Sequence, residues 1–411
     1  MSASQTGRRS YAPVWLTGLT NSVFGMYGGI VAVSVPQLLS ARHVPESTIA
    51  AMTAAMMSPG FWTFLVSPLL DVRFSRRWYA VVTAVLASVL LMLALANLQH
   101  LLLVEVFIVA GFFCANLYQS ALGGWLATTT TKEAEGKLST WVTVGNIGAG
   151  GAMAVLAGQV MRALPPTLGA MLIGAVLLLP LAVFPWMSSP GPDRRLARES
   201  FAQFFGEVIG LLKQRQVLVA IVLFISPTAT FSLTNFLSGI GHDFQASPAF
   251  VGVVGGVGVL AGGVAGCFCF RLIERALPTR VLYLAIAATG SLFTLALLLW
   301  ARTPAIFAVA LTGENVFQAL AITAMVAIAF DTIGRGNPLA ATTYCLMVSA
   351  SNIPITYMLL VDNWGYARAG VPGSFVIDAA VSLLSVALLG TLLLWFAQAR
   401  IGGRPARAAV P

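Results

Sequence analysis

Long apolar segments dominate this sequence and leave few folds open to it. A helix needs about 20 residues to cross the hydrocarbon core of a bilayer. Twelve segments are long and apolar enough, and they lie near residues 13–39, 47–70, 77–98, 101–127, 138–163, 167–188, 217–239, 249–273, 280–300, 304–330, 337–361 and 373–399. Membrane barrels show short segments of alternating hydrophobicity instead. The sequence therefore predicts an all-α membrane protein that crosses the membrane twelve times.

The scarcity of charge supports lipid as the surrounding solvent. Only 9% of the 411 residues are charged, whereas an average soluble protein has about 25%. The net charge of +9 therefore does not indicate nucleic-acid binding, and we expect no nucleic-acid partner. The four cysteines lie within apolar segments without the spacing of a metal site, and they are Cys114, Cys267, Cys269 and Cys345. We expect no metal and no cofactor.

The basic residues predict an orientation in the membrane. With twelve spans, 19 of the 23 Lys and Arg residues fall on one side, and the side rich in Lys and Arg is the cytoplasmic one. Both termini are then cytoplasmic. Arg8 and Arg9 precede the first segment as they would in an export signal, but no small-residue cleavage site follows. A first transmembrane helix is the better interpretation.

A polar segment divides the chain near its middle. Residues 188–200 read SSPGPDRRLARES, and residues 201–216 have the pattern of an amphipathic surface helix. We therefore expect a six-helix half over residues 1–188, a cytoplasmic linker over 189–216, and a second six-helix half over 217–411. The basic connections at 67–78 and 265–280 occupy equivalent places in the two halves.

Several motifs give the chain a family resemblance. They are Ser67-Pro68-Leu69-Leu70-Asp71 followed by Arg76-Arg77-Trp78, then Trp125 followed by Lys132 to Gly136, then Gly262-Gly263 through Arg271, and finally Glu314-Asn315. With these motifs the chain resembles the major facilitator superfamily, and within it the peptide/acetyl-CoA/drug transporter group that includes AmpG-type muropeptide permeases. It departs from the AmpG-type pattern at Gly123–Thr128, which lacks charge, and at Gly18-Leu19-Thr20.

The resemblance implies a major facilitator fold of 12 transmembrane helices in two six-helix halves. It also implies a secondary active transporter, a monomer in the inner membrane of a bacterium, that moves a small organic solute by alternating access with protons as the coupling ion. Muropeptide and siderophore import both follow from it. Drug or metabolite efflux by the same fold is an alternative, and a membrane-embedded sensor or enzyme is an alternative of another class.

Catalysis and direct use of ATP find little support in the residues. All three histidines, His43, His100 and His242, fall in predicted outer loops, and no span carries a pair of acids. No phosphate-binding P-loop sequence occurs either. We therefore expect a permease and not an enzyme.

Polar side chains inside the predicted spans are the candidates for a substrate path. Amides and hydroxyls provide directional hydrogen bonds and aromatic rings provide packing surfaces. The candidates are Asn21, Tyr27, Asn116, Gln119, Trp125, Asn146, Thr234, Asn235, Asn315, Gln318, Tyr344 and Asn352. For each single residue, a hydrogen bond between helices is an equally good interpretation.

An acid lies deep in the segment LTGENVFQALAIT, residues 311–323. Glu314 is ten residues, or about 15 Å of helix, from Pro304, which is near the middle of a core of about 30 Å. A charge at that depth costs at least about 2.5 kcal/mol. We expect Glu314 to couple protons to transport, with Gln318 one helical turn away; a protonated structural acid is the alternative. Glu105 and Asp378 are expected near the outer surface.

Charged residues of the cytoplasmic connections are candidates for a latch. In the resembled family the first of these loops pairs with other spans in one state of the cycle, and an acid there can bind an Arg or cap a helix N-terminus. The candidates are Asp71, Arg73, Arg76, Arg77, Arg271 and Glu274. Simple positive-inside topology is the alternative. Gly258, Gly262 and Gly266 are expected on one helix face that packs closely on a neighbour.

Overall fold

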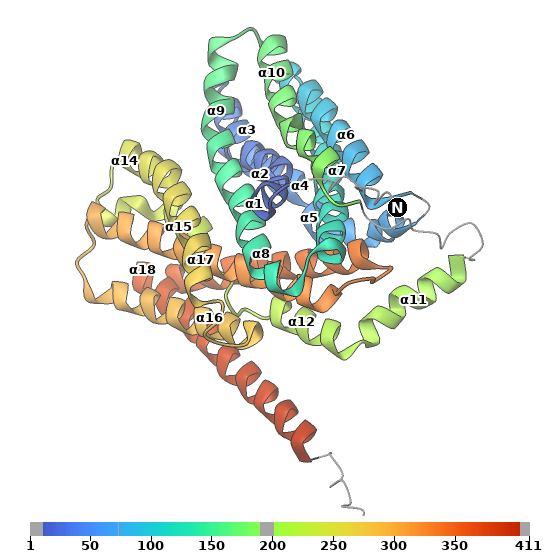
Figure 1. Ribbon diagram of the computed structural model, residues 1–411. Helices are drawn as coiled ribbons and strands as arrows, with labels where there is room; N and C mark the ends of the chain where they lie inside the picture. The colour runs from blue at the N-terminus through green and yellow to red at the C-terminus, as the bar shows by residue number, and fades with distance from the viewer. Residues whose placement is uncertain (1–10, 73, 190–200, 403–411) are drawn as a thin grey trace, which may run out of the picture.

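Helices make up every regular element that the computed structural model describes, which covers residues 11–72, 74–189 and 201–402 (Figure 1). The earlier helices are α1 (Val14–Leu19), α2 (Ser22–Gly29), η1 (Ile30–Ser34), α3 (Val35–Ser40), α4 (Glu46–Met57), α5 (Pro59–Trp62), η2 (Thr63–Leu65), η3 (Ser67–Asp71), α6 (Arg76–Ala96), α7 (Leu101–Thr129), η4 (Lys132–Ala134), α8 (Glu135–Thr143), η5 (Val144–Gly148), α9 (Ala149–Ala163), α10 (Pro166–Leu178) and η6 (Leu179–Trp186).

The later helices begin with α11 in the predicted linker. They are α11 (Phe201–Lys213), α12 (Arg215–Ile225), α13 (Leu233–Phe236), η8 (Leu237–Phe244), α14 (Pro248–Val253), η9 (Val254–Gly258), α15 (Val259–Ile273), α16 (Thr279–Ala296), η10 (Leu297–Leu299), α17 (Pro304–Ile333) and α18 (Ala340–Gly402). The surface helix expected over residues 201–216 is thus present as α11, shorter by three residues.

Nine helices in the described part of the chain are long and apolar enough to cross a membrane, whereas the sequence predicts twelve spans. The segment 47–70 breaks at Ser58 and Pro59 into the short helices α4 and α5. The segment 217–239 ends as a helix at Ile225 and resumes only at Leu233. The last two segments form the single element α18. Each predicted segment is apolar as expected. The number of helices differs from twelve because two segments are interrupted and two others are joined into one element.

A turn inside α18 separates the last two predicted spans. Ala369 and Gly370 leave the helical conformation, and Gly370 has φ 62° and ψ −149°. This region of backbone conformation is open to glycine because it lacks a Cβ atom. The helix before the turn runs seven residues beyond the predicted end of span 11, from 361 to Arg368, and the sequence prediction of that boundary was wrong.

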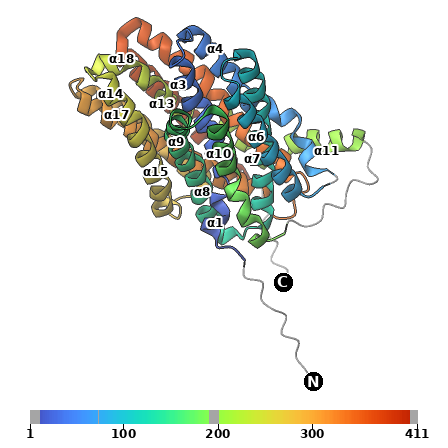
Figure 2. The ribbon, with the colours of Figure 1, turned by 90° about the horizontal axis from the view of Figure 1, so that it is seen from above.

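The helices form two groups that meet along one line. In Figure 1 the helices α1 to α10 lie above, and α12 to α18 lie below and to the left. The groups pack against each other through α7 on α18 and α8 on α17. In the view from above, α8 lies beside α1 and beside α15 (Figure 2).

The connections that follow α5, α7, α15 and α17 lie at one end of the molecule, which we call the basic face. They carry basic side chains, which include Arg76, Lys132, Arg275 and Arg335. The turn at Gly370 and the ends of α9 and α16 lie at the other end, which we call the opposite face.

Glycines allow α15 to pack closely on α17, as the four-residue spacing of Gly258, Gly262 and Gly266 predicts. A Cβ atom at Gly258 would lie 2.9 Å from Thr312 Oγ1, and one at Gly262 would lie 2.7 Å from Thr312 O. A Cβ atom at Gly266 would overlap with the carbonyl oxygen of Val316. The predicted close packing of this face is confirmed.

We therefore expect Gly266→Val to destabilise the protein by about 1–3 kcal/mol, the usual range for overpacking. The measurement is the thermal unfolding midpoint of the purified protein in detergent. Gly252→Val is the matched control, because no atom lies within 4 Å of the position where its Cβ would stand. Equal midpoints for the two variants would contradict the close packing of α15 on α17.

Candidate functional site

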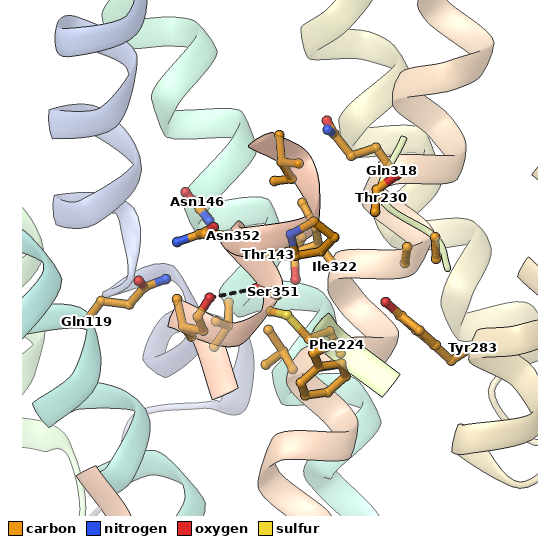
Figure 3. Close-up of a pocket in the computed structure, with 18 of the residues that line it drawn as sticks. Gln119, Thr143, Asn146, Phe224, Thr230, Tyr283, Gln318, Ile322, Ser351 and Asn352 are labelled. Atoms are coloured by element: carbon orange, nitrogen blue, oxygen red, sulfur yellow. Dashed lines mark hydrogen bonds between the residues drawn. The ribbon is translucent and has the colours of Figure 1, made fainter. Parts of the chain in front are cut away.

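A cavity of about 120 Å³ lies where the two groups of helices meet. Its walls come from α2, α7, α8 and η5 on one side and from α12, α16, α17 and α18 on the other. The polar side chains that line it are Asn21, Gln119, Thr143, Asn146, Thr228, Thr230, Tyr283, Gln318, Ser351 and Asn352 (Figure 3). Among the described residues, the lining includes no charged side chain. Phe24 and Phe224 add aromatic surface.

Three amides of the lining are oriented by hydrogen bonds to the protein. Asn21 Nδ2 donates to Val142 O over 3.2 Å, and Asn352 Nδ2 donates to Gly60 O over 3.1 Å. Gln318 Nε2 donates to Thr234 Oγ1 over 2.9 Å. Each bond uses one of the two N–H groups of its amide. Within the described part of the chain, the second N–H group and the carbonyl oxygen of each amide are then available to a solute.

Five of the twelve predicted path residues line this cavity: Asn21, Gln119, Asn146, Gln318 and Asn352. The other seven do not line this cavity in the described conformation, and their place on a substrate path stays a prediction. Asn116 and Asn315 are buried, and each donates to a carbonyl one turn back in its own helix, over 2.8 Å. These two side chains bind the backbone of their own helices and do not line the cavity.

Aromatic candidates pack between helices instead of facing the cavity. Tyr27 Oη donates to Ile108 O over 3.4 Å, and Trp125 Nε1 donates to Ser188 O over 2.8 Å. The ring of Tyr344 stacks on Phe330 with 6.0 Å between centroids. All three side chains are almost fully buried. Of the remaining two candidates, Thr234 accepts the hydrogen bond from Gln318, and Asn235 is exposed.

The break between α12 and α13 forms part of the cavity wall, and the sequence analysis did not predict it. Thr228, Ala229 and Thr230 line the cavity from this irregular segment. Ala229 and Phe231 have φ values of 57° and 47°, a region that costs non-glycine residues roughly 1–3 kcal/mol each. Such strained segments cluster at binding and switch sites. Ser226-Pro227 within an apolar run was the available signal.

Hydrogen bonds from tyrosines hold this broken segment in place. Tyr283 Oη donates to Thr228 O over 3.1 Å, and Tyr357 Oη donates to Ile225 O over 2.6 Å. The two carbonyls lack helical partners because the helix ends there, so side-chain donors replace the missing backbone donors. Thr228 Oγ1 is buried without a hydrogen-bond partner among the described residues.

Glu314 lies behind the cavity wall on α17. Its side chain is buried at 1% exposure, and its Oε1 accepts a hydrogen bond from Thr294 Oγ1 of α16 over 2.5 Å. Its Oε2 has no hydrogen-bond partner among the described residues. Gln318, one turn further along α17, lines the cavity. The structure therefore brings the predicted acid close to the cavity along its helix, though not into it.

Two aspartates join Glu314 in the interior. Asp362 falls just outside the predicted span 337–361, but it lies inside α18 with 0% exposure. Asp378 was expected near the outer side, and it lies eight residues after the turn at Gly370 with 6% exposure. Ser232 Oγ lies 2.5 Å from Asp362 Oδ2 and 3.3 Å from Asp378 Oδ1. One buried group of carboxyls results.

At the basic face, Asp71 binds the beginning of α18. Its Oδ1 accepts from Arg76 Nε over 2.8 Å and from Ala341 N over 3.1 Å. Its Oδ2 accepts from Thr342 N over 2.8 Å and from Thr342 Oγ1 over 2.7 Å. Arg76 Nη2 in turn donates to Pro338 O over 2.9 Å. A carboxylate thus caps a helix N-terminus and neutralises a buried guanidinium.

The other residues predicted for a latch are placed differently. Arg73 lies outside the described residues. Arg77 is half-buried, and Arg271 is exposed beside Lys137 on the surface. Glu274 faces Gly136 across the two groups of helices, and its Oε2 has no hydrogen-bond partner in the described part of the chain. Asp71 and Glu274 lie in equivalent connections of the two halves, but they make different contacts.

The arrangement defines a class of protein. A bundle of apolar helices encloses a polar cavity between two groups of helices, and hydrogen bonds join the two groups at the basic face. These are the features of a multi-pass membrane transporter. The family model described as Major Facilitator Superfamily matches residues 17–238. The chain belongs to the Major Facilitator Superfamily and has its all-helical fold.

Solved structures of other transporters agree in fold at low sequence identity. FucP in the outward conformation is 16% identical, with a TM-score of 0.64 and coverage of 92% of this chain and 99% of that chain. The human organic anion transporter MFSD10 is 16% identical with a TM-score of 0.62, covering 92% and 98%. The proton:xylose symporter XylE is 14% identical with a TM-score of 0.67, covering 92% and 95%. No curated protein sequence matches the chain significantly.

Proposed function

We propose that this protein is a proton-coupled secondary active transporter that imports a small, uncharged organic solute across the inner membrane of a bacterium. The central cavity carries the proposal. It is lined by amides and hydroxyls from both groups of helices, and no charged side chain of the described chain faces it. Such a lining suits a solute that is rich in hydroxyl or amide groups.

The mechanism we propose is alternating access between two six-helix halves, residues 1–188 and 217–411, joined by the linker 189–216. The basic face is the cytoplasmic one by the positive-inside rule, which puts both termini in the cytoplasm. Asp71 and Arg76 bind the beginning of α18 at that face. The described conformation then faces outward, and those bonds break when the cavity opens to the cytoplasm.

Proton coupling is the step for which we propose Glu314. A buried carboxyl is more stable when protonated, since an ionised group in a low-dielectric interior is costly. Glu314 is one helical turn from Gln318, which can contact a solute in the cavity. Proton binding at Glu314 and solute binding at Gln318 would then act on the same helix. Among the structurally similar proteins, FucP is a fucose:proton symporter and XylE is a proton:xylose symporter.

Several classes of solute are candidates for the cavity. Muropeptide and siderophore import follow from the family resemblance, and drug or metabolite efflux is the alternative. We favour an uncharged solute because an anionic one would need a cationic side chain in the cavity wall. We also propose that the protein works as a monomer, with lipid around it, and catalyses no chemical reaction.

Uptake into proteoliposomes with an imposed pH gradient tests the function. A gradient of one pH unit corresponds to about 1.4 kcal/mol and can drive about tenfold accumulation per proton. The screen would include neutral sugars and polyols, muropeptides, siderophores and drugs, in both orientations of the gradient. Accumulation of none of them in either orientation would contradict the proposal, and gradient-driven loss from loaded vesicles would establish export.

We expect Glu314→Gln to abolish this accumulation while solute exchange without a gradient persists, because the cavity is intact and the carboxyl is gone. Glu105→Gln is the matched control. Glu105 is also an acid within a span, but it is half-buried and does not belong to the buried group of Glu314, Asp362 and Asp378. Full gradient-driven accumulation by Glu314→Gln would contradict the role proposed for Glu314.

A further inference from the structure

Three carboxyl groups from three parts of the chain meet in the interior of the later helices. Glu314 comes from α17, whereas Asp362 and Asp378 come from α18 on either side of its turn. Ser232 bridges the two aspartates. The helix α17, which carries Glu314, packs against both α18 and α13. The exposed fractions of the three acids are 1%, 0% and 6%, so water does not screen their charges.

No basic side chain compensates these acids in the described part of the chain. The other charged groups of the neighbouring elements are engaged elsewhere. Asp243 of η8 accepts a hydrogen bond from Tyr366 over 2.7 Å, and the guanidinium of Arg368 lies 3.5 Å from the ring centroid of Trp364. Two carboxyl oxygens, Glu314 Oε2 and Asp362 Oδ1, are buried without a hydrogen-bond partner among the described residues.

A proton on one of the aspartates gives Ser232 two full hydrogen bonds. The Ser232 hydroxyl has a single hydrogen, and its oxygen lies 2.5 Å from Asp362 Oδ2 and 3.3 Å from Asp378 Oδ1. Two ionised carboxylates would have to share that hydrogen, because they only accept hydrogen bonds. When one carboxyl is protonated, Ser232 accepts from it and donates to the other, and neither contact is shared.

Thr294 presents the same shortage of hydrogens next to Glu314. Its Oγ1 lies 2.5 Å from Glu314 Oε1 and 3.1 Å from Gly290 O. A backbone carbonyl can only accept, and the hydroxyl has one hydrogen to donate. When Glu314 is ionised, its Oε1 accepts from Thr294 Oγ1, and the one hydroxyl hydrogen is shared with Gly290 O. When Glu314 is protonated, it can instead donate to Thr294 Oγ1, which leaves the hydroxyl hydrogen to Gly290 O.

We propose that Glu314, Asp362 and Asp378 form one shared proton-binding site that holds two protons, one on Glu314 and one on the pair of aspartates. This site deepens the proposed function, on which its role in transport rests, because the coupling unit becomes a cluster instead of Glu314 alone. Neutralising two of three acids removes most of the cost of burying like charges without a counter-ion.

The cluster is connected to the cavity by the broken segment between α12 and α13. Thr228, Ala229 and Thr230 of that segment line the cavity, and Ser232 binds the aspartates. A few residues of strained backbone therefore link solute contacts to proton contacts. Movement of this segment on solute binding would displace the Ser232 hydroxyl and release the hydrogen bond that holds the shared proton.

Infrared difference spectroscopy tests the site without a known solute. Wild-type protein in hydrated lipid films, at neutral pH, should show the carbonyl-stretch band of protonated carboxyls, shifted on transfer to D₂O. Asp362→Asn, Asp378→Asn and Glu314→Gln should each lose part of the band, and the triple variant should lose all of it. Ser232→Ala should shift the aspartate part, because it removes the bridging hydroxyl and leaves the acids in place. Glu105→Gln is the control and should leave the band unchanged.

A band that survives in the triple variant, or is absent from the wild type, would overturn the proposal. So would loss of the wild-type band on adding Na⁺ at constant pH, because a metal cation would then occupy the site. The test is independent of transport. If the band behaves as expected but no pH gradient drives accumulation, the shared site stands and the proposed function fails. If Glu314→Gln loses gradient-driven accumulation but the aspartate variants keep the full band, the shared site fails and the proposed function stands.

Discussion

An Asp71→Ala variant is expected to open the basic face of the protein. In the wild type, the Asp71 carboxylate accepts four hydrogen bonds, from Arg76, Ala341 N, Thr342 N and Thr342 Oγ1. Its removal uncaps α18 and leaves the guanidinium of Arg76, with 8% of its side chain exposed, without its carboxylate. Loss of one partner of a buried ion pair costs roughly 3–5 kcal/mol, and that cost falls on the closed conformation.

The expected shift can be measured as a distance between labels on the two groups of helices. Fluorophores on Lys137→Cys and Arg275→Cys, in a background without Cys114 and Cys269, should move apart in Asp71→Ala. Asp331→Ala is the matched control, since Asp331 also pairs across the groups, with Lys132 over 3.6 Å, but both side chains are exposed at 45% and 81%. Such exposed pairs contribute about 1 kcal/mol or less. A label distance equal in both variants would exclude a latch at Asp71.

The sequence predicts the helical membrane fold well because hydropathy reports the composition of each span directly. Hydropathy is a weaker predictor of the places where a helix is interrupted. Ser58-Pro59 and Ser226-Pro227 lie inside apolar runs, so a count of apolar residues passes over both. In a membrane, a broken helix needs other donors for its freed carbonyls. Here Tyr283 and Tyr357 supply them from distant parts of the chain, which local sequence does not reveal.

The site was predicted in part for a similar reason. Residue type identifies amides that can bind a solute, and five of the candidates line the cavity, but the direction of a side chain depends on the rotation of its helix. Asn315 and Gln318 lie on one helix, and only Gln318 faces the cavity. Asp362 was missed because the predicted span ended at residue 361. Gly370 followed by Pro372 was the better signal for the helix end, and it keeps Asp362 inside the span.

A Gly124→Ala variant should open the same face by a steric route. Gly124 of α7 lies against the first residues of α18, and a Cβ atom there would stand 2.6 Å from Ala341 Cα and 2.8 Å from the carbonyl carbon of Ala340. Both are backbone atoms, which cannot rotate away as a side chain can. The clash exists only where α7 and α18 touch, so the variant disfavours the closed conformation by about 1–3 kcal/mol, a shift of roughly 5- to 150-fold in population.

The same pair of labels measures this shift, and Gly148→Ala is the matched control, because a Cβ atom there would make ordinary contact at 3.6 Å with Val264. An unchanged label distance in Gly124→Ala would contradict the closure of α7 on α18. The double variant with Asp71→Ala separates the two causes. Both changes act on the contact that α18 makes at the basic face. The change in label distance in the double variant should therefore be smaller than the sum of the changes in the two single variants. Full additivity would mean that Asp71 and Gly124 control different steps, and that the Asp71 contacts do not belong to the closure that Gly124 permits.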